Sequence, residues 1–233
     1  MKVTLIVPTL NEIEGMREIM PRLKPEWYDQ LLIIDGGSTD GTIEFAKQQG
    51  YSVISQKRRG MRHAYLETLP FVEGDAVITF SPDGNSLPEC IPDLVEMLRQ
   101  GYDMVIVSRY KGGAHSQDDT FISGLANRVF TKTINLLFRA SYTDALVIYR
   151  AYRKALIHEL DLDKEASYSP AESLFRVIMS WEMLLSIRAV KRRLKIGEIS
   201  GDEPCRIGGR RKLHVKWGFA YMFQLLREVF VWQ

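Results

Sequence analysis

Three apolar runs in the first third of the chain each end in a polar loop rich in turn-forming residues. The runs are Val3–Val7, Leu31–Ile34 and Ala76–Phe80, and the loops begin at positions 8, 35 and 81. The loops that follow parallel strands meet at one edge of a sheet, where ligands bind. The third loop contains Asp83 and Asn85, whose carboxylate and amide oxygens could hold a divalent cation against a diphosphate. This pattern predicts an α/β fold with a site at that edge.

Strand-like and helix-like segments alternate up to about residue 110. We expect strands at Val3–Val7, Leu31–Ile34, Tyr51–Ile54, Ala76–Phe80 and Met104–Val107, and helices at Glu12–Leu23, Gly41–Gln49, Met61–Leu69 and Leu87–Gln100. This alternation predicts βαβ units and a mostly parallel sheet whose strand carboxyl ends lie together. Asp40 is expected to cap the second helix, with Glu44 supporting its first turn.

Beyond residue 120 the pattern becomes mostly helical. We expect helices at Phe121–Arg139, Ser169–Arg188 and His214–Trp232, a short apolar run at Ala145–Tyr149, a last strand at Leu194–Ile199 and a Gly- and Arg-rich loop at Gly201–Lys212. We therefore divide the chain into one α/β domain over residues 1–213 and a C-terminal amphipathic helix over residues 214–233. Because that helix is apolar and aromatic, it could pack in the core, contact a second copy of the chain, or lie on a membrane surface.

The distribution of charge says more about partners than the total does. The 233 residues are 45% hydrophobic and carry a formal net charge of +2, but residues 191–216 hold nine Lys or Arg against three Asp or Glu. Such a basic segment attracts phosphates, anionic lipid or nucleic acid. Cys90 and Cys205 lack metal-ligand spacing, which indicates a reduced, cytoplasmic chain. We recognise no signal peptide and no apolar run of about 18 residues that predicts a membrane-spanning helix.

The first two loops each have a structural and a functional interpretation. Asn11 and Glu12 could cap the helix that follows, or the segment from Pro8 to Glu12 could contact a nucleoside. The second loop, from Asp35 to Thr42, matches neither G-x-x-x-x-G-K-[ST] nor G-x-G-x-x-G, so the P-loop and Rossmann fingerprints are absent. It could be a tight turn with an Asp cap, or Asp35 could accept hydrogen bonds from a base or a ribose.

The order and spacing of these motifs resemble family 2 glycosyltransferases of the GT-A fold. The resemblance rests on Pro8–Glu12, Ile34–Thr42 and the Asp83 loop, and it continues in Gly60–Tyr65, Ser108–Tyr110, Gly112–Gly113, Ser123–Arg128, Thr143–Asp144, Tyr149–Arg150 and Arg206–Leu213. The later motifs resemble the branch that acts on polyprenyl phosphates, which contains dolichol-phosphate mannose synthases and undecaprenyl-phosphate sugar transferases. The resemblance runs from Lys2 to about Leu213 and implies a Rossmann-like, mostly parallel sheet flanked by helices.

The resemblance implies an inverting transferase that moves a sugar from a nucleotide-diphosphate donor to an acceptor in lipid-linked glycan or surface polysaccharide assembly. It implies that Asp83 and Asn85 hold Mg²⁺ or Mn²⁺, and that Asp83 and Asp144 are catalytic. The same match implies that the donor is bound by Pro8, Glu12, Asp35, Arg62, Pro82, Asp83, Arg109, Arg128, Arg206 and Lys212. An Arg guanidinium grips phosphate oxygens bidentately, whereas Lys supplies a point charge.

Three positions depart from the family's pattern. Ser81 stands at the first position of the usual D-x-D, Gly36 stands where relatives carry a second Asp for the nucleoside, and Ala145–Arg150 replaces the usual Thr-Ser-Gly-Phe-Arg stretch. One carboxylate fewer at the metal means weaker charge neutralisation. These changes leave open an altered donor, an altered acceptor, a weakened enzyme, or a non-catalytic protein that binds a nucleotide sugar or acts as a scaffold.

The need for a general base separates the two kinds of acceptor. A phosphate is already a nucleophilic anion at pH 7, whereas a saccharide hydroxyl needs a base, which would come from Asp118, Asp119 or Asp144. This favours a polyprenyl phosphate, met by a cytoplasmic protein that is peripheral on the inner face of the membrane. A homodimer stays open, and a nucleic-acid partner, which rests only on the charge of residues 191–216, is not expected.

Overall fold

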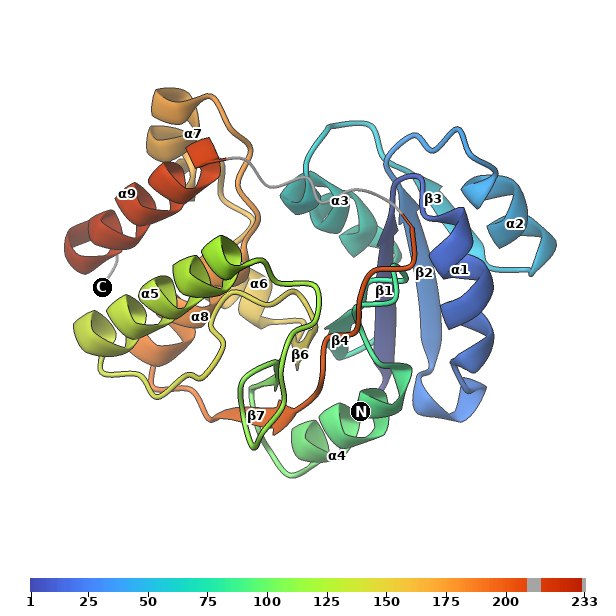
Figure 1. The fold of residues 1–233 in the computed structure, drawn as a ribbon, viewed down its shortest axis with the longest axis horizontal. Coiled ribbons are helices and arrows are strands. Elements are labelled where there is room, and N and C mark those ends of the chain that lie inside the picture. The colour runs from blue at the N-terminus through green and yellow to red at the C-terminus, as the bar shows by residue number, and fades with distance from the viewer. Residues whose placement is uncertain (209–214, 232–233) are drawn as a thin grey trace.

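A seven-stranded sheet with the order β3-β2-β1-β4-β6-β5-β7 forms the centre of the computed structural model, which describes residues 1–208 and 215–231 (Figure 1). The strands are β1 (Val3–Thr9), β2 (Gln30–Asp35), β3 (Ser52–Ser55), β4 (Ala76–Thr79), β5 (Met104–Ser108), β6 (Arg150–Arg153) and β7 (Ile196–Ser200). Strand β6 is antiparallel to β4 and β5, and the other pairs are parallel. The prediction of a mostly parallel α/β sheet is confirmed.

Helices cover both faces of this sheet. They are α1 (Ile13–Ile19), α2 (Thr42–Gln48), α3 (Met61–Thr68), α4 (Ile91–Arg99), α5 (Phe121–Phe138), α6 (Leu156–Glu159), α7 (Ser169–Phe175), α8 (Glu182–Lys191) and α9 (Val215–Val231), with 3-10 turns at Met20–Arg22, Pro25–Trp27, Leu69–Phe71, Pro88–Cys90 and Glu165–Ser167. Leu5 and Val7 belong to the hydrophobic cluster that includes α1 and α4, whereas Ile6 belongs to the cluster that includes α3, α5 and α8. Because both faces of β1, β4 and β5 are buried, these three strands are mostly apolar.

The second half of the chain departs from the predicted elements. The expected helix over Ser169–Arg188 is two helices, α7 and α8, because Arg176 adopts a left-handed conformation with φ of 53°. The short apolar run Ala145–Tyr149 leads into β6, a strand that the sequence did not predict. In this run Ala145 and Tyr149 are buried, so it contributes to the core.

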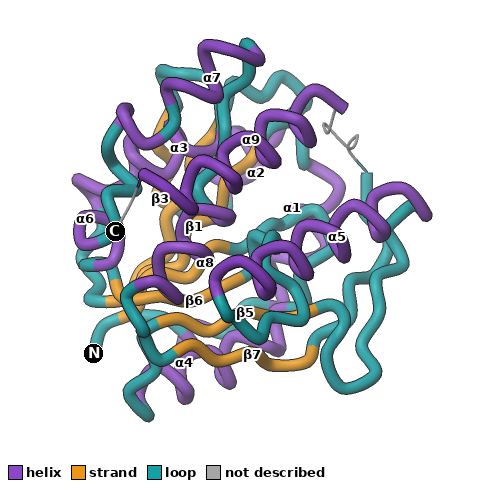
Figure 2. The backbone as a smooth tube through the Cα atoms, turned by 90° about the vertical axis from the view of Figure 1, so that its left-hand side faces the viewer, coloured by secondary structure: helices purple, strands orange, loops and turns teal. Residues whose placement is uncertain are grey.

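The last helix, α9, is packed against α5, α7 and α8, and Figures 1 and 2 show it running beside α5. Its inner side is fully buried at Leu225 and Glu228, and Glu228 pairs with Arg188 of α8 at 2.9 Å. One side of α9 is therefore part of the core, and the division of the chain at residue 213 stays a prediction. Within the described residues, none of the helices is both long enough and apolar enough to cross a membrane.

Candidate active site

The loop after β4 presents Asp83 at the carboxyl edge of the sheet. Gly84 turns this loop with φ of +92°, a value that favours glycine, and the Asn85 N–H then donates to Asp83 Oδ1 at 3.1 Å. Helix α1 approaches the loop so closely that a Cβ on Gly15 would lie 2.3 Å from the Pro82 carbonyl oxygen. Asp83 is therefore held in a buried position by two glycines that allow close backbone packing.

The segment after β7 lies directly on this loop. The Ile207 N–H donates to the Asp83 carbonyl at 2.7 Å, and Arg206 Nη1 lies 2.7 Å from Asp83 Oδ2. The other terminal nitrogen of Arg206 lies 3.4 Å from Asp118 Oδ2, which also accepts a hydrogen bond from Asn85 Nδ2 at 3.1 Å. The structure thus brings the predicted residues Asp83, Asn85 and Arg206 together with Asp118.

The Asp35 carboxylate links the end of β1 to the loop after β2 through hydrogen bonds. Asp35 Oδ2 accepts the N–H groups of Gly37 and Ser38 at 2.7 and 2.8 Å, while Asp35 Oδ1 accepts the hydroxyls of Ser38 and Thr9 at 2.5 and 3.1 Å. Pro8 lies in β1 opposite Ile34. The Asp35 carboxylate therefore shapes its own loop, and its predicted contact with a nucleoside stays a prediction.

Helix capping in this region differs from expectation. Glu12 occupies the N-cap position of α1 but makes no side-chain capping bond, so the cap interpretation of Glu12 is wrong. Instead, Asp40 Oδ2 accepts the Ile13 N–H at 3.1 Å. Asp40 also accepts the Thr42 N–H at 3.0 Å at the start of α2, although the N-cap residue is Gly41. One Asp therefore supports the starts of two helices and joins their loops.

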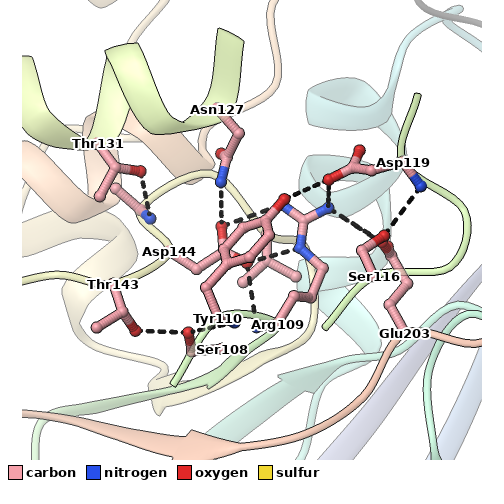
Figure 3. A network of polar contacts seen from close by, with 12 residues as sticks. Ser108, Arg109, Tyr110, Ser116, Asp119, Asn127, Thr131, Thr143, Asp144 and Glu203 are labelled. Carbon is pink, nitrogen blue, oxygen red and sulfur yellow. Dashed lines mark hydrogen bonds and ion pairs between the residues drawn. The ribbon is translucent and has the colours of Figure 1, made fainter. Parts of the chain in front are cut away.

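A second polar network lies after β5 (Figure 3). Arg109 is bound bidentately by Asp144, with Nε 2.6 Å from Oδ2 and Nη2 3.0 Å from Oδ1, and Asn127 Nδ2 donates to Asp144 Oδ1 at 3.1 Å. Arg109 Nη1 also lies 3.2 Å from Glu203 and 3.9 Å from Asp119. Both Asp144 oxygens are thus engaged, and the carboxylate is fully buried.

Burial and charge set the protonation of this network. Burial raises the pKa of Glu203, and the Arg109 cation only partly opposes it. Burial also raises the pKa of Tyr110, whose hydroxyl donates to Asp119, so it stays protonated at neutral pH. Burial lowers the pKa of Arg109, but the Asp144 carboxylate raises it further, and the guanidinium stays charged. Arg109 is therefore a permanent cation enclosed by three carboxylates.

Arg62 and Arg128 lie outside these two networks. The Arg62 guanidinium is fully buried; it lies 2.9 Å from Glu165 and 2.9 Å from Glu172, and it stacks 4.2 Å above the centre of the Tyr168 ring. Arg128 is exposed on α5, 6.0 Å from the centre of the Tyr110 ring. Contact of either residue with the donor stays a prediction, and Lys212 lies outside the described residues.

A pocket of about 360 Å³ opens between residues 110–120 and the first turns of α5. Its lining combines the cation Arg128 with the rings of Tyr110 and Phe121, the apolar Leu125, and Asp119. Because Asp118 contacts the Asp83 loop and the next residue, Asp119, lines this pocket, the two sites are neighbours.

Sequence reasoning missed two residues of these sites. Asp118 was considered only as a base, although it contacts Asn85, and Glu203 was not singled out at all. No spacing rule links Asp118 to Asn85, because the two are 33 residues apart. Over residues 1–208 and 215–231, no group of three or more His, Cys, Asp or Glu is arranged to hold a metal ion. A cation at Asp83 would therefore depend on amide or donor oxygens as well.

Comparison with known proteins gives the same family as the motifs. The family described as Glycosyl transferase family 2 matches residues 4–161. A dolichol-phosphate mannosyltransferase of Pyrococcus furiosus is 25% identical over 237 residues, which cover 97% of this chain and 63% of that protein. An undecaprenyl-phosphate 4-deoxy-4-formamido-L-arabinose transferase of Serratia proteamaculans is 29% identical over 171 residues, covering 68% of this chain and 51% of that protein. The chain thus spans between half and two thirds of these relatives.

A solved structure gives the same fold. Glucosyl-3-phosphoglycerate synthase from Mycobacterium tuberculosis, in complex with Mn²⁺, uridine diphosphate and phosphoglyceric acid, superimposes with a TM-score of 0.70 at 20% identity, covering all of this chain and 80% of that one. The fold is therefore the predicted GT-A arrangement, and because the family match extends over more than half of the residues, the chain belongs to the family 2 glycosyltransferases.

Proposed function

We propose that this chain transfers one sugar from a nucleotide-diphosphate donor to a polyprenyl phosphate, with inversion at the anomeric carbon. The names of the two relatives, a dolichol-phosphate and an undecaprenyl-phosphate transferase, support this acceptor. The observation that carries the proposal is the adjacency of the two sites: Asp118 contacts Asn85 beside Asp83, and Asp119 lines the pocket under Arg128. A donor diphosphate at the first site would place its sugar next to an acceptor in the second.

The residues of the Asp83 loop fit a divalent cation. Asn85 Oδ1 is buried and has no hydrogen-bond partner among the described residues, and it lies beside the carboxylate of Asp83. Oxygen ligands of this kind suit Mg²⁺ or Mn²⁺, and a related fold was crystallised with Mn²⁺ and uridine diphosphate. When bound, the ion would offset the charge that develops on the departing nucleoside diphosphate. Asp83 and Asn85 would hold it, and Arg206 would meet the phosphates.

The carboxylates near the site are engaged in ways that disfavour a general base. Each oxygen of Asp144 accepts a hydrogen bond from Arg109, and Oδ1 also accepts one from Asn127. We therefore infer that Asp144 positions Arg109 and does not remove a proton. Asp119 accepts from Tyr110 and Ser123 and faces Arg109. A hydroxyl acceptor would need a base with a free oxygen, whereas a phosphate acceptor needs none. The geometry therefore favours the phosphate.

The pocket suits an acceptor with an anionic head and an apolar tail. Arg128 is the cation at its wall, and the N-terminus of the 18-residue helix α5, capped by Thr120, adds a partial positive charge. From the pocket, apolar side chains continue along the exposed face of α5 at Phe121, Leu125 and Val129. We propose that the phosphate binds near Arg128 and that the polyprenyl chain leaves along this face.

We further propose that helices α5 and α9 meet the membrane surface. Each carries an exposed apolar stripe at helical spacing: Phe121, Leu125, Val129 and Leu136 on α5, and Phe219, Phe223, Leu226 and Phe230 on α9. Phe121 is 85% exposed and Phe230 is 79% exposed. Helix α5 has no acidic residue, and Glu228, the acidic residue of α9, is buried against Arg188. The exposed charges, such as Lys132 and Lys216, are cationic and complement anionic lipid.

The test is a transfer assay with purified protein, Mn²⁺ and radiolabelled UDP-, GDP- and dTDP-sugars, offered either undecaprenyl phosphate in anionic vesicles or free saccharides. We expect label to enter the organic phase with one donor, only when metal and lipid phosphate are present. Label on a saccharide instead would contradict the proposed acceptor.

Ser81 and Gly36 motivate a second candidate function, that of a non-catalytic nucleotide-sugar-binding protein. Tight donor binding with neither transfer nor hydrolysis would favour it.

A further inference from the structure

Gln56, the residue that follows β3, has a side-chain amide whose orientation is set by the backbone around it. Its Nε2 donates to the carbonyl oxygens of Arg58 and Gly60, the second at 2.8 Å. Because a carbonyl oxygen can only accept and an amide nitrogen can only donate, the amide cannot be flipped. Within residues 1–208 and 215–231, Gln56 Oε1 accepts no hydrogen bond. The loop thus presents one amide oxygen as a fixed acceptor with its capacity unused.

This oxygen lies against Gly36, at the end of β2. A Cβ on Gly36 would lie 3.2 Å from Gln56 Oε1, which is a tight contact. The backbone does not require glycine there, because Gly36 is not among the residues with positive φ, whereas its neighbour Gly37 has φ of +98°. Gly36 is exposed and Gln56 is partly exposed. Gln56 Oε1 therefore occupies the space that a side chain at position 36 would enter, on an accessible surface.

The fixed acceptor lies at the same edge of the sheet as Asp83. Strands β1 to β4 are parallel neighbours in the order β3-β2-β1-β4, and the Gln56 N–H donates to the Asp35 carbonyl at 2.8 Å. Two to three strand spacings of about 4.8 Å separate the end of β4 from the ends of β2 and β3. A nucleoside diphosphate that is bound through its phosphates beside Asp83 can extend over this distance, so its base can meet Gln56.

We infer that Gln56 determines which base the donor carries, because its Oε1 accepts a hydrogen bond from a ring N–H of that base. This inference rests on the proposed function, in which the donor is a nucleotide-diphosphate sugar, and it deepens that proposal by naming the class of base. Uracil and thymine present N3–H, and guanine presents N1–H, at the centre of the pairing edge. Cytosine N3 and adenine N1 are acceptors, so with these bases two lone pairs would face each other and Oε1 would stay unpaired. The site therefore selects a uracil, thymine or guanine nucleotide.

The experiment is calorimetric titration of the purified full chain with UDP, dTDP, GDP, CDP and ADP in the presence of Mn²⁺. We expect UDP, dTDP or GDP to bind most tightly. CDP and ADP should each bind at least about tenfold more weakly than that nucleotide, because a polar group left without its hydrogen bond is costly.

The variant Gln56→Met keeps an unbranched side chain of similar length and removes Oε1. We expect the ratio of the CDP dissociation constant to that of the tightest nucleotide to fall to about threefold or less. This ratio is the decisive quantity, because a loop that is merely loosened by the lost Nε2 contacts would weaken every nucleotide alike. The matched control is Gln48→Met, at an exposed glutamine of α2, which should keep the ratio of the wild type.

Several outcomes would overturn the inference. Binding of CDP or ADP as tight as that of the best of the other three nucleotides would do so in the wild type alone. An unchanged ratio in Gln56→Met would show that Gln56 only holds its loop, and an equal fall of the ratio in Gln48→Met would show that the effect is not specific to Gln56.

Failure of this inference and failure of the proposed function give different results. Transfer of sugar from a CDP-sugar donor, added to the transfer assay, would refute the inference and leave the proposed function standing. The expected selectivity among nucleotides without any transfer would refute the proposed function and leave the inference standing. Absence of binding of all five nucleotides would overturn both.

Discussion

Arg109 and Arg206 are both predicted to bind the donor, yet the structure holds the side chain of Arg109 by more and shorter contacts than that of Arg206. Arg109 has two short bonds to Asp144 and further contacts with Glu203 and Asp119, and its side chain is 12% exposed. Arg206 has one short contact with Asp83 and a longer one with Asp118, its side chain is 22% exposed, and its Nε has no partner in the described part of the chain. The first guanidinium is fixed by its surroundings, whereas the second can exchange partners. We therefore expect Arg109 to matter for stability and Arg206 for catalysis.

The largest expected effect comes from Asp83→Asn, which removes the short partner of Arg206 and the proposed metal ligand together. We expect kcat/KM for sugar transfer to fall about a thousandfold, because the charge of the departing diphosphate loses its main stabiliser. The measurement is initial-rate transfer at saturating Mn²⁺, with the melting temperature as the control for folding. Activity within tenfold of the wild type would remove Asp83 from the centre of the site.

Replacement of the fixed guanidinium is expected to act on folding. Arg109→Met leaves the buried Asp144 and the mostly buried Glu203 without their cation, and loss of one member of a buried ion pair costs about 3–5 kcal/mol. Urea unfolding at pH 7 measures this loss of free energy. If the variant were as stable as the wild type, the network in Figure 3 would not be a structural element, and Arg109 would regain its predicted contact with the donor.

Replacement of the exchangeable guanidinium is expected to cost less stability than replacement of Arg109. Arg206→Gln removes one short contact, to Asp83, from a side chain that is 22% exposed, so the free energy of unfolding should fall by less than in Arg109→Met. Sugar transfer should nevertheless fall about a hundredfold, since a charge-assisted contact to the leaving phosphate is lost. The same two measurements on Arg109→Met provide the comparison. A variant that loses stability but keeps activity would reverse the roles of the two residues.

The sequence predicted the edge of the sheet where both arginines lie, but not their partners. Apolar runs locate strands because each strand must bury both faces, and parallel strands bring their loops together, so Asp35, Asp83 and Arg109 could be placed at one edge. Partner choice depends on long-range packing. Arg62 pairs with Glu172 across 110 residues, and Arg206 pairs with Asp118 across 88 residues, so no local spacing reveals either contact.

Local rules also failed where the backbone takes a left-handed turn. The helical pattern of residues 169–188 continues through Arg176, yet φ of 53° at that residue ends α7 there. Neither side-chain type nor periodicity signals such a turn at Arg. Similarly, strand β6 was missed because its sequence, Arg150 to Arg153, has charged residues at both ends. Arg150 is nevertheless fully buried, since Ser186 Oγ and the carbonyl of Val147 accept its hydrogen bonds at 3.0 and 2.9 Å.

The smallest expected effect is a change in how the free energy of unfolding depends on pH. Burial raises the pKa of Glu203 above its ordinary value of 4.5, so the folded chain holds this proton more tightly than the unfolded chain. The stability that this group contributes is therefore fully present below pH 4.5, and it is lost as the pH rises through the higher pKa of the folded state. In Glu203→Gln this part of the pH dependence should vanish, although the variant also alters one contact with Arg109. Urea unfolding of both proteins at several pH values upward from 4.5 gives the difference in slope. If the free energies of unfolding of the two proteins ran parallel with pH, the cation of Arg109 would fully compensate the burial of Glu203. A difference in slope of the opposite sign would mean that the cation outweighs the burial.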